Sequence, residues 1–134
     1  MTFAAQILTL YPEMFPGPLG TSLAGRALSE GKWSCAPIQI RDFATDKHRS
    51  VDDTPAGGGA GMVMRADVLA TAVDHARSAQ PDASVIAMTP RGAPLTQARV
   101  PQLAYRTGVT ILCGRFEGIY QRLFEDRAID EITI

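Results

Sequence analysis

The chain has 134 residues, of which 46% are hydrophobic and 20% are charged, and its formal net charge is -1. This balance indicates a folded, soluble domain and excludes a disordered chain, and the near-zero charge gives no overall support for nucleic-acid binding. The apolar run at the N-terminus is too short to span a membrane and has no basic segment before it, so we expect a cytoplasmic protein. Cys35 and Cys113 are expected to be reduced, buried thiols.

Short apolar runs predict the strands. They lie at residues 4–10, 35–40, 84–88 and 109–113, and a further strand begins at 132–134. These runs are continuous rather than alternating, which is typical of strands that are covered on both faces of a sheet.

Segments with apolar residues at helical spacing lie between the strands and predict four helices. The capping residues expected at their starts are Thr21 or Ser22 for the first, Asp67 for the second and Thr96 for the third. Gly31 ends the first helix, Pro81 ends the second, Pro101 gives the third an irregular first turn, and the fourth covers 119–127. Strands that alternate with helices predict an α/β fold with a mostly parallel sheet and helices on both faces.

Three loops with unusual residues leave the carboxyl ends of predicted strands, at 41–65, 89–96 and 114–119. Ligands of open α/β sheets bind beyond these strand ends, so the three loops form the candidate site. The longest loop has four glycines within five residues, which lets a backbone approach a ligand closely. It lacks the glycine spacing of dinucleotide-binding and phosphate-binding loops, which counts against a generic nucleotide-binding domain.

The same long loop carries a small basic cluster. Lys47, His48 and Arg49 lie beside Asp52 and Asp53. One interpretation is a solvated loop whose charges pair with each other. The alternative is contact with phosphate, with the glycines admitting a flat base close to the backbone.

The two shorter loops are also open to two interpretations. They contain the sequences TPRG at 89–92 and GRFEG at 114–118. Each is either an ordinary strand-to-helix turn, with Glu117 paired to an arginine at the surface, or part of a small-molecule pocket in which Arg115 and Glu117 face the reacting partner.

The other reactive side chains have simpler interpretations. His75 lies among charged residues of a predicted helix and is expected at the surface. Neither His75 nor His48 has metal-ligand spacing with a cysteine, so no metal is expected. Cys113 ends an apolar strand, which favours a packed thiol over a nucleophile.

The segments RDFATDKHRSVDDTPAGGGAGMVM, MTPRG and CGRFEGI, together with the earlier YPEMF and GRAL, identify a family resemblance. In this order and spacing they resemble the bacterial tRNA (guanine-N1)-methyltransferase family, which belongs to the SPOUT group with a trefoil-knotted fold. The resemblance covers essentially the whole chain. It implies a homodimeric enzyme that uses S-adenosylmethionine to methylate ring nitrogen 1 of the guanosine immediately 3′ of the tRNA anticodon.

The resemblance also implies roles for particular residues. The cofactor is expected to contact Thr89, Pro90, Gly92, Gly114, Ile119 and Ile134. Arg115 and Glu117 correspond to residues near the methyl group and the target base. The residues expected to contact the tRNA are Pro55, Gly57, Gly58 and Gly59, in the wall of the guanine pocket, with Lys47, His48 and Arg49. In the family, an aspartate from the C-terminal region of the partner subunit is the general base, and this chain has no counterpart of it.

Departures from the family pattern define the remaining expectations. Ala56 stands where an aromatic residue is usual, and Tyr120 and Gln121 replace two acidic residues. The chain stops at Ile134, before the third knot loop, so we expect residues 1–134 to be a cofactor-binding N-terminal domain with an incomplete knot and little activity by itself. The alternative is a non-catalytic module of the same family that binds tRNA or dimerises.

Overall fold

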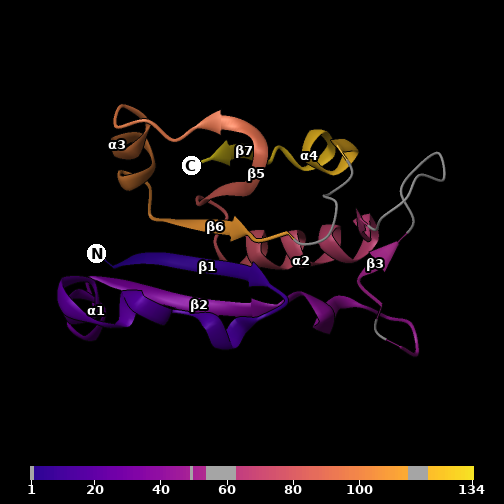
Figure 1. The fold of residues 1–134 in the computed structure, drawn as a ribbon, viewed down its shortest axis with the longest axis horizontal. Helices are drawn as coiled ribbons and strands as arrows, with labels where there is room; N and C mark the ends of the chain where they lie inside the picture. The colour runs from indigo at the N-terminus through magenta and orange to yellow at the C-terminus, as the bar shows by residue number, and fades with distance from the viewer. Residues whose placement is uncertain (1, 49, 54–62, 115–120) are drawn as a thin grey trace.

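The computed structural model describes residues 2–48, 50–53, 63–114 and 121–134. Among these residues, the main element is a parallel sheet of five strands in the order β2-β1-β6-β5-β7 (Figure 1). The strands are β1 (Phe3–Thr9), β2 (Trp33–Gln39), β5 (Ser84–Pro94), β6 (Gly108–Leu112) and β7 (Asp130–Thr133). The predicted α/β fold with a mostly parallel sheet is therefore confirmed.

Helices connect these strands. The described α-helices are α1 (Ser22–Ser29), α2 (Ala66–Ala79), α3 (Arg99–Ala104) and α4 (Gln121–Arg127), and short 3-10 helices are η1 (Pro12–Met14), η2 (Gly17–Gly20) and η3 (Ile40–Phe43). No helix in the described part of the chain is long and apolar enough to cross a membrane.

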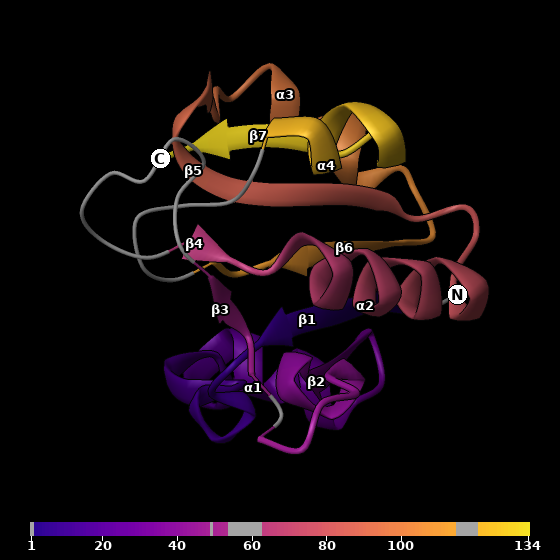
Figure 2. The same ribbon diagram turned by 90° about the vertical axis from the view of Figure 1, so that its right-hand side faces the viewer.

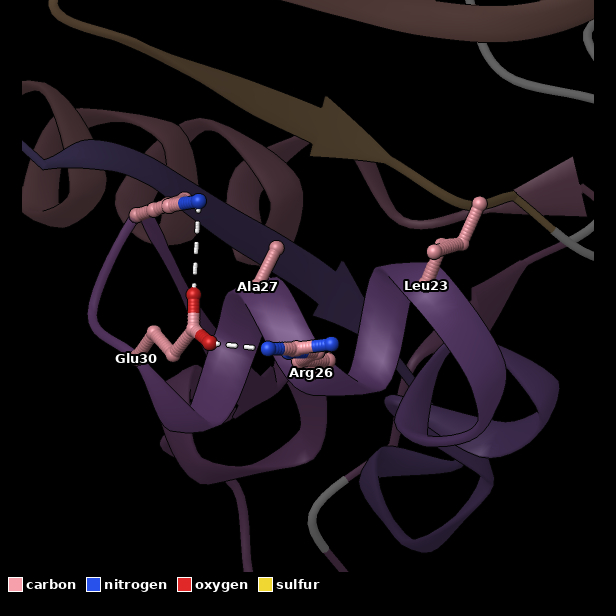
Figure 3. Close-up of a pocket in the computed structure, with 5 residues that line it drawn as sticks. Leu23, Arg26, Ala27 and Glu30 are labelled. Atoms are coloured by element: carbon pink, nitrogen blue, oxygen red, sulfur yellow. Dashed lines mark hydrogen bonds and ion pairs between the residues drawn. The ribbon is translucent and has the colours of Figure 1, made fainter.

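Both faces of the sheet are covered, as predicted. The larger apolar cluster joins the buried face of α2 and residues of α4 to one face of the sheet, where Leu8 and Leu112 are fully buried. A smaller cluster around Ile86 on the opposite face includes Leu103 of α3. Figure 2 shows α2 beside β6 and β1, and Figure 3 shows α1 in front of β1 with α2 behind it. The apolar runs of the strands are thus explained by burial on two sides.

Strand β5 is longer than the predicted run at 84–88. It continues to Pro94 and curves beside β7 (Figure 1). Ile132 of β7 pairs with both Met88 and Ala93. The segment 89–94, predicted as an open loop, is instead held against β7. Gly92 allows this close approach, because a Cβ atom there would lie 2.4 Å from the backbone nitrogen of Ile132.

Two predicted helix caps are wrong. Helix α2 begins at Ala66, after Arg65, and the carboxylate of Asp67 accepts hydrogen bonds from the Arg65 side chain at 3.1 and 2.8 Å. Helix α3 begins at Arg99 rather than after Thr96. Pro101 is then the third residue of α3, in the first turn, where its missing N–H breaks no bond of the helix.

The predicted long loop at 41–65 is also partly ordered into regular structure. Its first residues belong to η3, and further along it β3 (Asp52–Asp53) and β4 (Val63–Met64) form a short antiparallel pair. The pair is anchored by Val51 and Met64, which are buried, and by a 2.7 Å hydrogen bond from the Arg65 amide to the Val51 carbonyl. Sequence periodicity missed this hairpin because strands of two residues carry no pattern.

Candidate functional site

The carboxyl ends of the parallel strands place several predicted site residues along one edge of the sheet. Thr89 follows the first part of β5, Gly114 follows β6, and Ile134 follows β7. Gly114 and Pro90 are exposed there, and Ile134 is 97% exposed. The structure therefore brings the described members of the predicted cofactor site to neighbouring strand ends.

A hydrogen-bonded group joins the predicted cofactor segment to β7. The hydroxyl of Thr89 donates to Oε1 of Glu131 at 3.1 Å, and Arg91 Nη2 lies 3.4 Å from the same oxygen. The Glu131 side chain is 18% exposed, whereas that of Arg91 is 59% exposed. Glu131 thus restrains both residues, and sequence analysis missed it. Its signal was weak, because it lies in an acidic pair, Asp130 and Glu131, at a predicted strand start.

A cavity of about 360 Å³ lies on the other side of Gly114, at the ends of β1 and β6. It is lined by Thr9, Leu10, Tyr11, Met14 and Phe15, from the end of β1 through η1, and by residues 113–114. The aromatic residues of this segment were missed as site residues. The available signal was the YPEMF sequence directly after an apolar strand.

The two cysteines and His75 are consistent with structural roles. Burial raises the pKa of the Cys113 thiol and of the Cys35 thiol, and both cysteines are free. A raised pKa keeps these thiols protonated and poorly nucleophilic at neutral pH. His75 is exposed on α2, with its ring centroid 5.1 Å from that of Phe43, so the predicted surface position is confirmed.

Lys47 and His48 lie far along the same edge from Thr89. They follow η3 beyond the end of β2, and strands β1 and β6 separate β2 from β5. Both side chains are exposed. The structure does not bring them next to the predicted cofactor segment, and whether they contact phosphate stays a prediction.

The loop that carries Lys47 and His48 is anchored by Asp46. Its carboxylate accepts hydrogen bonds from the amide and the hydroxyl of Ser50, each at 2.8 Å, and it lies 3.9 Å from Arg65 Nη1. The Ser50 hydroxyl, followed by the Ser50 amide, lowers the pKa of Asp46. Asp46 is not one of the residues of the predicted basic cluster, and whether the charges of Lys47, His48 and Arg49 pair with Asp52 and Asp53 stays a prediction.

A second cavity, of about 250 Å³, lies beside α1 and is a poor candidate (Figure 3). Its charged side chains pair with each other, since Arg26 and Lys32 contact the two carboxylate oxygens of Glu30 at 3.0 and 3.3 Å. Lys32 also directly precedes β2, which places the cavity at the amino edge of the sheet, opposite the predicted site.

Comparison with known proteins decides the family. The model for tRNA (Guanine-1)-methyltransferase TrmD matches residues 2–134. The chain belongs to this family. Curated members named tRNA (guanine-N(1)-)-methyltransferase from Rhizorhabdus wittichii, Novosphingobium aromaticivorans and Mesorhizobium japonicum are 80%, 69% and 68% identical to it over 134 residues. These matches cover 100% of this chain and 54–58% of the relatives, so the chain spans about half the length of the curated relatives it matches.

Membership of the tRNA (guanine-1)-methyltransferase family confirms the resemblance stated from the sequence motifs, and the parallel α/β sheet is consistent with it. The remaining residues named from those motifs are Arg49, Pro55, Gly57, Gly58, Gly59, Arg115, Glu117 and Ile119, and they lie outside the described residues. Their roles stay predictions.

Proposed function

We propose that this chain forms the cofactor-binding domain, residues 1–134, of a cytoplasmic tRNA (guanine-N1)-methyltransferase. The reaction is transfer of a methyl group from S-adenosylmethionine to N1 of the guanosine 3′ of the anticodon. The family match over residues 2–134 is the observation that carries this proposal. The common edge occupied by Thr89, Gly114 and Ile134 supports it, since a ligand at strand ends can reach all three.

The residues described fit a cofactor that is held largely by backbone groups. Pro90 and Gly114 are exposed at the same edge, and Gly92 packs against the backbone of β7, which holds the segment that contains Pro90 in place. We assign cofactor contacts to Thr89, Pro90, Gly92, Gly114, Ile119 and Ile134. When bound, S-adenosylmethionine supplies an electrophilic methyl group attached to a sulfonium.

The target guanine is assigned to a wall formed by Pro55 and residues 57–59, with Arg115 and Glu117 beside it. Nitrogen 1 of guanine carries a proton that must leave when the new bond to carbon forms, so a general base has to lie near the pocket. We assign that base to an aspartate outside this chain, supplied by the partner subunit of a homodimer. Lys47, His48 and Arg49 are assigned to tRNA phosphates.

Exposed leucines support the proposed homodimer. Leu19 of η2 is 54% exposed and Leu23 of α1 is 80% exposed, and the two elements are in contact. Large apolar side chains on neighbouring exposed elements are a common feature of subunit interfaces.

The experiment uses a chimera in which residues 1–134 replace the matching half of the Rhizorhabdus wittichii relative. The purified chimera and a tRNA transcript are incubated with labelled S-adenosylmethionine. A transcript with adenosine in place of the target guanosine is the matched control. We expect methylation of the first transcript alone, and Glu117→Ala should lower turnover. A chimera that binds tRNA but does not methylate it would favour the non-catalytic module.

A further inference from the structure

The cavity beside Gly114 lies at the point where the chain changes direction across the sheet. From β1 the chain continues to β2 on one side, whereas from β6 it continues to β7 on the other side. The ends of β1 and β6 are adjacent, and such a switch point is where open α/β sheets bind ligands. Residues 9–11 and 113–114 line the cavity from these two strand ends.

The residues that line the cavity favour one kind of ligand. The cavity has no charged side chain among its described lining residues, which include two aromatic residues, Tyr11 and Phe15, and Met14. A phosphate would find no cation in this lining. A flat, uncharged ring would gain stacking and sulfur contacts. The volume of about 360 Å³ is within the range of small-ligand pockets.

The cavity shares Gly114 with the proposed cofactor site but extends away from it. The cofactor is assigned to the segments after β5, β6 and β7, whereas the cavity lies on the β1 side of Gly114. We propose that this cavity binds a nucleobase of the tRNA adjacent to the target guanosine. The inference rests on the proposed function, because it requires an RNA whose reacting base lies close to Gly114.

The first test is photocrosslinking with the chimera. Anticodon stem-loop RNAs carry 4-thiouridine immediately 5′ or immediately 3′ of the target guanosine, and crosslinked peptides are mapped. We expect at least one of the two RNAs to crosslink within residues 9–15. Crosslinks confined to other segments, with RNA bound, would overturn the proposal.

The second test removes the ring. Tyr11→Leu should weaken binding of the stem-loop about tenfold, the loss of one stacked base. An abasic nucleotide at the crosslinking position should cause a similar loss in the unaltered chimera and no further loss in the variant. Tyr105→Leu is the matched control, because Tyr105 is 90% exposed and follows α3 at the amino edge of β6.

Two further outcomes separate the hypotheses. If Tyr11→Leu weakens binding of S-adenosylmethionine in calorimetry, the cavity belongs to the cofactor and the nucleobase proposal fails while the proposed function stands. If the chimera neither binds nor methylates the stem-loop, the proposed function fails and the nucleobase proposal fails with it. If Tyr11→Leu leaves the binding and methylation of the stem-loop unchanged, the nucleobase proposal fails while the proposed function stands.

Discussion

Substitution of Gly92 by alanine tests the contact between β5 and β7. The added Cβ atom would lie 2.4–2.6 Å from three backbone atoms of Glu131 and Ile132, whereas ordinary contact begins at 3.4 Å. None of these atoms can rotate away, so the two strands must separate by about 1 Å. Overpacking of this kind costs about 1–3 kcal/mol, and a lengthened hydrogen bond adds about 1 kcal/mol. We therefore expect Gly92→Ala to lower the free energy of unfolding by about 2–4 kcal/mol.

Urea unfolding followed by circular dichroism measures this loss for residues 1–134. The midpoint should fall by about 1–2 M, given the slope usual for a domain of this size. Gly20→Ala is the matched control, because its Cβ atom would meet Pro16 at 3.4 Å and the backbone needs no unusual angle. We expect it to change stability by less than about 1 kcal/mol. An unchanged midpoint for Gly92→Ala would refute the close approach of β5 to β7.

Two further predictions concern ionisable groups. Hydrogen bonds from Ser50 lower the folded-state pKa of Asp46, so its carboxylate should stabilise the fold above its usual pKa of 3.8 and lose that effect as the pH falls through the lower value. Asp46→Asn should thus be less stable at pH 7, with a gap in unfolding free energy that closes in acid; a gap independent of pH would contradict this. In a Cys35→Ser variant, Cys113 should react with Ellman's reagent at pH 8 more slowly than free cysteine, because burial raises its pKa. Unfolding in urea should restore the rate, and a fast reaction in the folded protein would refute the inference.

The fold was predictable where local pattern and burial agree. The apolar run at 84–88 lies in β5, and residues 109–112 of the next run lie in β6. The helical spacing of Val68, Leu69 and Ala72 matches the buried face of α2. In these segments, a continuous apolar run predicts a strand that is buried on both faces, and an apolar repeat of 3.6 residues predicts a helix that is buried on one face.

The helix caps failed because capping residues have more than one possible partner. Asp67 is a suitable capping residue by type, but its carboxylate accepts a hydrogen bond from Arg65 instead, with Nη2 2.8 Å from Oδ2. Thr96 is equally suitable, but the helix begins only at Arg99, after a turn in which the Thr96 carbonyl accepts hydrogen bonds from the Arg99 and Val100 amides. Residue type alone does not determine which neighbour is in reach.

The candidate site, like the fold, could be predicted from the sequence only in part. The sequence motifs were sufficient to identify the family. They also led to the prediction that Thr89, Gly92 and Gly114 contact the cofactor, which stays a prediction. They did not identify Glu131 as the partner of Thr89, because the two are 42 residues apart and meet through the pairing of β5 with β7. The same limit applied to Tyr11 and Phe15, which flank η1 and line the cavity.

By itself, the sequence determined the family, the alternation of strands and helices, and the positions of the glycine-rich and Thr-Pro-Arg-Gly motifs, because these depend on residue types at short separations. The tertiary structure decided the strand order, the path of residues 89–94 along β7 and the cavity where β1 and β6 end. These features depend on which distant segments pack together, and that choice is made by the burial of whole faces rather than by local preference.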